Sequence, residues 1–220
     1  MRAGTGKTTI ARKMGQVYYD MGVLASAEVI ECSASDLVGQ YVGQTGPKTQ
    51  KLFEKGLGKV LFVDEAYRLA GGHFAQEAID ELVGLLTHET YKGKIIVILA
   101  GYDDDMKRLM QVNTGLASRF PEWVNFSNIS SKACLDIVLK QLKKEGIVVG
   151  ELLDEQTTEY KEMMEEIDGL SSLPDWGNAR DMMTLADKLI NYVLISGNAS
   201  GQLTMSGAEA VSVTREMVKD

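Results

Sequence analysis

The 220-residue sequence has few of the residues that cross-link a chain and no run that could carry it through a membrane. Its two cysteines, Cys32 and Cys134, lie far apart and form no C-x-x-C pair, which argues against a disulfide framework or a zinc site. No apolar run approaches the ~18 residues of a membrane helix. Residues 1–25 are not expected to be a signal peptide, because lysine and glycines interrupt any apolar stretch. We therefore expect a soluble intracellular protein with reduced cysteines and no membrane partner, located in the cytoplasm, with the nucleus or a plastid as alternatives.

An excess of basic charge is also absent. The formal net charge is −8, which argues against non-specific binding to nucleic acid. The acidic excess is uneven, since residues 1–126 contain 14 Lys and Arg against 15 Asp and Glu, whereas residues 127–220 contain 9 against 16. The apolar content of 45% is ordinary for a globular protein. We expect two domains with different surfaces, spanning residues 1–127 and 128–220.

Two glycines flank a threonine near the start of the sequence, in Gly4-Thr5-Gly6-Lys7-Thr8-Thr9. This stretch matches the second half of the phosphate-binding loop G-x-x-x-x-G-K-[ST]. Apolar spacing predicts a helix over residues 8–21, whose N-terminus would favour phosphate. Lys7 is expected to neutralise the phosphates and Thr8 to bind Mg²⁺. The first glycine of the motif falls on Met1, so a chance glycine-rich turn before a helix remains the alternative.

A second motif begins at residue 60, where Val-Leu-Phe-Val is followed by Asp64 and Glu65. Four apolar residues in a row predict a strand buried on both faces. Asp64 is expected to hold Mg²⁺, and Glu65 to orient and activate the attacking water. A buried strand with a solvated acidic end is the alternative. The position of Asp64, 57 residues after Lys7 with a strand and a helix between them, favours a nucleotide site, because a phosphate loop needs a metal partner on a neighbouring strand.

Strands and helices alternate over the first part of the chain and give way to helices alone. Strands are predicted at 27–32, 60–63, 95–100 and 123–126, and helices after Pro47 and at 74–87 and 103–112. This alternation predicts a parallel α/β sheet. Beyond residue 128, apolar periodicity predicts four helices, at about 130–145, 155–167, 179–195 and 207–218. The two histidines, His73 and His88, are expected on the surface without a catalytic role.

The ordered set of motifs resembles the AAA+ ATPases, and within them the branch of the CbbX-type rubisco activases and stage V sporulation protein K. The motifs that carry the resemblance are L-V-G-Q-Y-V-G-Q-T-G-P-K-T from residue 37, V-L-F-V-D-E-A-Y from residue 60, I-L-A-G-Y-D-D-D-M from residue 98 and G-N-A-R from residue 177. Together they span essentially the whole chain. The implied fold class is α/β: a P-loop NTPase sheet followed by a small all-helical lid.

The resemblance implies roles that the residues alone do not. It implies ATP and Mg²⁺ as cofactors, a ring hexamer or tandem AAA+ modules, and a protein substrate. Arg119 falls at the arginine finger, which reaches the ATP of the next subunit, and Arg180 at sensor 2 on the lid. Tyr41, Val42 and Gly43 fall at the pore loop that grips a polypeptide, and residues 71–74 at a second pore loop. The sensor 1 position carries Gly-Tyr102 in place of the usual polar residue.

The strand that normally leads into the phosphate loop would lie before residue 1. In AAA+ sheets this strand is central, so its absence predicts that strands 95–100 and 123–126 face each other across a gap, with unpaired backbone groups. We expect the 220-residue chain alone to be poorly stable and weakly active.

The leading hypothesis for function is an ATPase that remodels or threads a protein through a ring pore. One alternative is a nucleotide-binding scaffold without turnover, which the missing first glycine favours. Another is a motor that acts on nucleic acid, which the acidic charge and Tyr41 disfavour.

Overall fold

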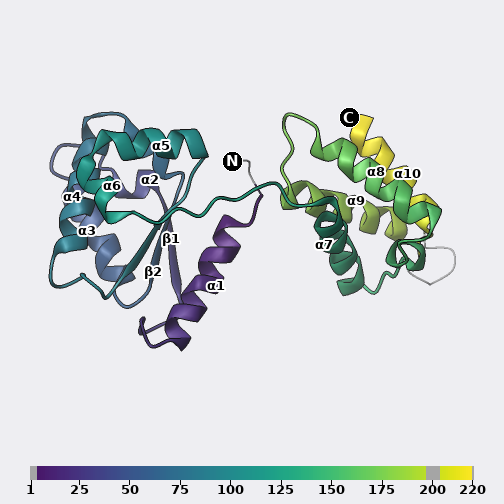
Figure 1. The fold of residues 1–220 in the computed structure, drawn as a ribbon, viewed down its shortest axis with the longest axis horizontal. Helices are drawn as coiled ribbons and strands as arrows, with labels where there is room; N and C mark the ends of the chain where they lie inside the picture. The colour runs from purple at the N-terminus through teal and green to yellow at the C-terminus, as the bar shows by residue number, and fades with distance from the viewer. Residues whose placement is uncertain (1–3, 197–203, 220) are drawn as a thin grey trace. The chain divides into compact units, whose positions relative to one another are not determined.

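The computed structural model describes residues 4–196 and 204–219, which form two compact units (Figure 1). The first unit comprises residues 6–126. The second comprises the described residues from 127 onward, together with Gly4 and Thr5. The opening of the phosphate-loop motif, at Met1, Arg2 and Ala3, lies outside the described residues.

The first unit is built on a parallel sheet of three strands, β1 (Val29–Ser33), β2 (Val60–Asp64) and β3 (Ile96–Leu99). Strand β2 is central, pairing Val60 with Val29 on one side and with Ile96 on the other. The predicted parallel α/β sheet is confirmed. The helices of this unit are α1 (Lys7–Asp20), α2 (Ala34–Leu37), α3 (Thr45–Gly56), η1 (Ala66–Ala70), α4 (His73–Thr87), α5 (Asp103–Val112) and α6 (Thr114–Arg119).

The two faces of this sheet are covered unequally. Side chains alternate along a strand, so Leu61 and Val63 belong to a large core cluster that also takes side chains from helices α3, α4, α5 and α6. Phe62 points the other way and shares a small cluster with Ala11 and Ala100. Helix α1 covers that second face with small residues. At Gly15 a Cβ would lie only 2.9 Å from the Ala27 carbonyl oxygen, so α1 packs close to the sheet.

The prediction of a strand at residues 123–126 is wrong. This segment takes part in no strand of the described chain, and Trp123 is 47% exposed. Residues 119–126 instead line a groove of about 350 Å³ together with α1, α5 and β3. Among the described residues β3 pairs only with β2, so its other edge has no strand beside it, and all four of its apolar side chains are partly exposed. A strand needs a hydrogen-bonded neighbour, and across this groove the segment has none.

The second unit is helical, as the apolar periodicity predicts. It contains α7 (Ser131–Lys144), η2 (Gly150–Leu153), α8 (Thr158–Ser171), α9 (Ala179–Ser196) and α10 (Gly207–Lys219), shown in green to yellow in Figure 1. All four α-helices contribute to one buried cluster, with Leu135, Met163 and Leu185 among its members. Helix α8 starts three residues later than predicted because the Thr157 hydroxyl accepts the Tyr160 N–H and caps the helix there.

Both cysteines are free thiols in apolar surroundings. Burial raises the pKa of Cys32 to about 12, with a further contribution from the Asp36 charge, and raises the pKa of Cys134 to about 11. Such thiols remain protonated near neutral pH and are poor nucleophiles. No helix among the described residues is long and apolar enough to cross a membrane.

Candidate functional site

The second half of the predicted phosphate loop leads directly into α1. Gly6 precedes the helix with φ 90°, in the left-handed region that favours glycine. Lys7 is the first helical residue, one position before the predicted start, and Thr8 and Thr9 follow it in the first turn. Since Gly6 has no side chain to cap the helix, the first backbone N–H groups of α1 are suited to meet an anion.

The first half of the described loop packs with the helical unit. Gly4 has φ 67°, and its carbonyl oxygen accepts the Ala179 N–H at 3.2 Å. A Cβ at Gly4 would lie 1.9 Å from the Gly177 carbonyl oxygen, so no other residue fits there without displacement. Thr5, the next residue, is buried. The loop is thus divided between the units, with Gly4 and Thr5 in one and Gly6 onward in the other.

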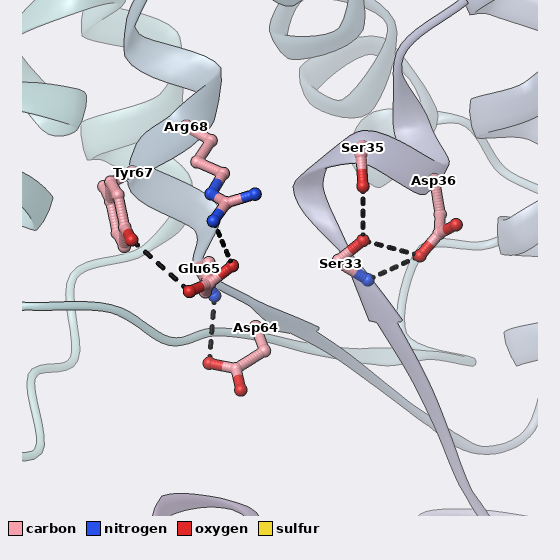
Figure 2. Close-up of polar contacts among 7 residues, drawn as sticks. All are labelled: Ser33, Ser35, Asp36, Asp64, Glu65, Tyr67 and Arg68. Atoms are coloured by element: carbon pink, nitrogen blue, oxygen red, sulfur yellow. Dashed lines mark hydrogen bonds and ion pairs between the residues drawn. The ribbon is translucent and has the colours of Figure 1, made fainter. Parts of the chain in front are cut away.

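The two predicted carboxylates lie at the end of β2, where the chain turns sharply (Figure 2). The Glu65 N–H donates to Oδ1 of Asp64 at 2.9 Å. Glu65 itself has φ 51°, a left-handed conformation that is uncommon for a residue other than glycine. The next N–H, that of Ala66, donates to the Ala100 carbonyl at 2.9 Å, just beyond β3. The turn after β2 is therefore tied to the segment that follows β3.

The Glu65 carboxylate contacts two side chains of η1 (Figure 2). Its Oε2 lies 2.9 Å from Nη2 of Arg68, and its Oε1 lies 3.5 Å from the Tyr67 hydroxyl. The hydrogen bond with Tyr67 and the charge of Glu65 together raise the pKa of Arg68. The Arg68 and Glu65 side chains are 57% and 40% exposed, and such surface ion pairs contribute little to stability because solvent screens them. The pair is therefore easily exchanged for another partner.

Two aromatic rings connect this carboxylate with Lys7. The ring of Tyr102, just after β3, lies 5.6 Å from that of Tyr67. The Lys7 ammonium lies 6.0 Å from the centre of the Tyr102 ring, at the outer limit of a cation–π contact. The structure thus brings Lys7, Tyr102 and Glu65 to the same edge of the sheet. The sequence motifs gave Tyr67 and Arg68 no role, although these residues lie only two and three positions after Glu65.

A second polar cluster lies at the end of β1, beside Asp64 in the sheet register (Figure 2). The Ser33 N–H and hydroxyl both donate to Oδ2 of Asp36 at 2.8 Å. The Ser33 side chain also accepts the backbone N–H of Asp36, which completes a capping box at the start of α2. The hydrogen bond from the Ser33 N–H is the main cause of the lowered pKa of Asp36. The cluster ends β1 and turns the chain away from the sheet.

The predicted pore-loop residues lie at the tip of an exposed turn. Tyr41 is 68% exposed and Val42 is 88% exposed, and Gly43 has φ 79°. The base of the turn is fixed, because the Thr45 hydroxyl, which is buried, accepts the Gly39 N–H at 3.1 Å. The turn therefore presents two apolar side chains to solvent on a fixed base. At the predicted second pore loop, the structure has the Gly71-Gly72 turn and the start of α4.

The two predicted arginines lie in different units. Arg119 is the last residue of α6 and is exposed; its Nη1 donates to the Gly115 carbonyl at 3.2 Å and to the Ser118 hydroxyl at 2.8 Å. Arg180 is exposed in the first turn of α9, where its backbone N–H donates to the Gly177 carbonyl.

Comparisons with known proteins agree with this geometry. Residues 2–128 match the family described as ATPase family associated with various cellular activities (AAA). The chain is 36% identical over 190 residues to stage V sporulation protein K of Bacillus subtilis, covering 85% of this chain and 58% of that protein. It is 36% identical over 191 residues to a CfxQ homolog of Galdieria sulphuraria, covering 84% of this chain and 59% of the relative.

A third relative is the chloroplastic ribulose bisphosphate carboxylase/oxygenase activase of Cyanidioschyzon merolae, 35% identical over 190 residues, with 84% of this chain and 62% of the relative covered. The chain therefore spans about three fifths of the length of these relatives. These matches and the motifs that carry them lead to one conclusion: the chain belongs to the AAA family of ATPases, in the branch of the CbbX-type rubisco activases and stage V sporulation protein K.

Proposed function

We propose that this chain binds and hydrolyses ATP and uses the energy to remodel a protein substrate. The observation that carries the proposal is the meeting of Lys7, Tyr102 and Glu65 at the carboxyl edge of the sheet. Ligands of open α/β sheets bind at this edge. A cation, a helix N-terminus and a carboxylate at one such edge match the needs of phosphoryl transfer.

Each of these groups has a distinct task in the proposed reaction. The first turn of α1 and the Lys7 ammonium bind the phosphates, because both offer positive charge to an anion. Glu65 orients the attacking water and accepts its proton. Glu65 must first leave Arg68, which costs little because both side chains are substantially exposed. The rings of Tyr67 and Tyr102 connect Glu65 with Lys7 through pairwise contacts.

The residues present fit a Mg²⁺ ion. The Asp64 carboxylate and the Thr8 hydroxyl are hard oxygen donors, the type that Mg²⁺ prefers. No group of three or more His, Cys, Asp or Glu residues within the described ranges could hold a metal by itself. A donor set of this size suits Mg²⁺, which is usually held by one or two side chains together with phosphate oxygens and water. The ion would neutralise charge on the phosphates.

We further propose that the active form is a ring hexamer, with Arg119 acting on the ATP of the neighbouring subunit and Arg180 contacting the phosphates within its own chain. The exposure of both arginines supports these roles. A guanidinium at the transferred phosphoryl group stabilises the charge of the transition state.

Exposed Tyr41 and Val42 support a polypeptide as the substrate, which would be gripped in the central pore. Replacement of Tyr41 by Ala is expected to leave basal ATP hydrolysis intact while abolishing work on the substrate.

The decisive experiment compares Glu65→Gln with Glu89→Gln, a matched change at an exposed carboxylate of the same unit. Glu65→Gln is expected to bind ATP as tightly as the native chain and to lose turnover by about 10²–10⁴-fold, the usual contribution of a general base. Glu89→Gln should change neither. Unaltered turnover in Glu65→Gln would refute the role of Glu65.

A further inference from the structure

The helix that carries Arg119 is held at its start by one amide side chain with two bonds. Asn113 caps α6, since its Oδ1 accepts the Leu116 N–H at 3.1 Å. Its Nδ2 donates to Oδ1 of Asp80 at 2.8 Å. Asp80 lies in α4, so a single side chain both starts α6 and bonds it to the neighbouring helix.

Two further contacts hold α6 against α4. Leu116 is 1% exposed and belongs to the main core cluster of the unit. At Gly115 a Cβ would lie 3.1 Å from Cγ1 of Val83 and 2.9 Å from Oδ1 of Asn113, so the helices approach closely there. Val83 and Asp80 are three residues apart and therefore lie on the same face of α4. Together, Leu116, Gly115 and Asn113 fix the distance and the orientation of α6.

The chemistry of position 113 is more specific than capping requires. Ser, Thr and Asp cap helices about as well as Asn, because all offer an oxygen to the free N–H groups. Of these, only Asn also carries an N–H donor that can reach a carboxylate while its oxygen remains on the cap. The bond to Asp80 therefore explains why an amide serves here.

We propose that Asn113 and Asp80 are positioning residues for Arg119: their bond sets the orientation of α6 and so the place at which the guanidinium reaches a neighbouring subunit. The inference rests on the proposed role of Arg119 in a neighbour's site. Arg119 bonds to the Gly115 carbonyl and the Ser118 hydroxyl of its own helix, so the direction of its side chain follows that helix. A misplacement of about 1 Å can cost two orders of magnitude in rate, so a small tilt of α6 is enough to reduce turnover.

A charge swap separates this role from capping. Asn113→Asp keeps a good cap but sets a carboxylate against Asp80. Turnover of the full chain is expected to fall roughly five- to tenfold, the size of a coupling between residues in contact, with ATP affinity unchanged. Asp80→Asn alone should have little effect, because its amide oxygen still accepts from Asn113. The double variant Asn113→Asp/Asp80→Asn restores the bond with donor and acceptor exchanged, and turnover should return to within about twofold of native, since the coupling between the two sites is recovered.

Mixing experiments test whether the defect acts between subunits. Chains with Lys7→Ala have an impaired phosphate loop of their own but a native α6. When Lys7→Ala chains are mixed with Asn113→Asp chains, turnover per Asn113→Asp chain should rise. The reason is that the nucleotide site of an Asn113→Asp chain can then face the native α6 of a Lys7→Ala neighbour. Chains that combine Lys7→Ala with Asn113→Asp should give no such rescue.

The outcomes separate this inference from the proposal on which it rests. If Arg119→Ala loses turnover and is rescued by Lys7→Ala chains while Asn113→Asp turns over normally, only the positioning role is overturned. The same holds if the double swap stays as impaired as Asn113→Asp. If Arg119→Ala itself keeps native turnover, both ideas fall. Should Asn113→Asp not fold, Asp80→Ala removes the acceptor without adding charge, and native turnover in that variant would overturn the inference.

Discussion

Helices α7 to α10 bury their apolar faces in one continuous cluster, whereas the sheet of the α/β unit has a large cluster on one face and a cluster of three buried residues on the other, among the described residues. Along β3 this leaves four apolar residues partly exposed beside a groove. The helical unit therefore has one closed core, while the α/β unit has one sparsely packed face.

Part of the candidate site lies beside this sparsely packed face. Lys7 and Arg119 both line the groove, and Tyr102 lies three residues after the end of β3. Binding and catalytic segments are commonly drawn from the less stable parts of a protein, because they must rearrange around ligands. The comparison thus predicts that nucleotide binding stabilises the α/β unit more than the helical unit.

The largest expected effect comes from matched core truncations. Leu189→Ala, at a buried position of α9, should destabilise the helical unit by about 2–5 kcal/mol, because it leaves a cavity in a closed core. Ile98→Ala, beside the groove, should cost only about 1 kcal/mol, because the Ile98 side chain is only partly buried and its truncation removes less apolar area from the core.

Urea unfolding can follow each unit separately, since Trp176 lies in the helical unit and Trp123 in the α/β unit. Single-tryptophan variants, Trp123→Phe or Trp176→Phe, provide the two signals. Equal losses for the two truncations would remove the contrast between the units.

A smaller effect is expected at two glycines with left-handed backbones. Gly22 has φ 72° with open space where a Cβ would lie, so Gly22→Ala should cost about 1 kcal/mol from the backbone alone. Gly4→Ala adds a clash with the Gly177 carbonyl and should lower the stability reported by Trp176 by about 1–3 kcal/mol. If Gly4→Ala affected only the Trp123 signal, the packing of Gly4 with the helical unit would be wrong.

The smallest effect is expected at two capping carboxylates, one in each unit. Asp36 and Glu209 have lowered pKa values, chiefly because they accept the backbone N–H of Ser33 and Ser206. A carboxyl whose pKa is lower in the folded state stabilises the fold above its unfolded pKa, and this contribution disappears as pH falls through the folded pKa. Stability should therefore decline as the pH falls below 3.8 for Asp36 and below 4.5 for Glu209, the ordinary pKa values of these side chains.

Acid titrations of Asp36→Asn and Glu209→Gln, followed through Trp123 and Trp176 respectively, check this point. Each variant should have a shallower acid decline in its own unit only. A native slope in both variants would show that other carboxylates account for the acid sensitivity.

Sequence patterns predicted those parts of the fold in which periodicity is strong. Helix α5 has the predicted bounds, and β2 follows from four consecutive apolar residues. The strand at 123–126 failed because an apolar, aromatic segment becomes a strand only beside a partner, which local sequence does not reveal. The short helices α2 and α6 give too few residues for a periodic signal.

For the site, the motifs pointed to Lys7 and Glu65, and the structure places them near one another through Tyr102. The contacts of Glu65 with Tyr67 and Arg68 could not be predicted, because they depend on the left-handed backbone of Glu65. The bond between Asn113 and Asp80 joins residues 33 positions apart in different helices, and no periodic pattern relates them.

Equilibrium binding of a slowly hydrolysed ATP analogue with Mg²⁺ tests the central claim most directly. Lys7→Ala is compared with Lys13→Ala, which removes an exposed lysine from the same helix. Lys7→Ala is expected to weaken binding at least about tenfold, or about 1.4 kcal/mol, while Lys13→Ala should bind as the native chain does. Equal affinity in the two variants would contradict the assignment of residues 4–9 as the phosphate loop.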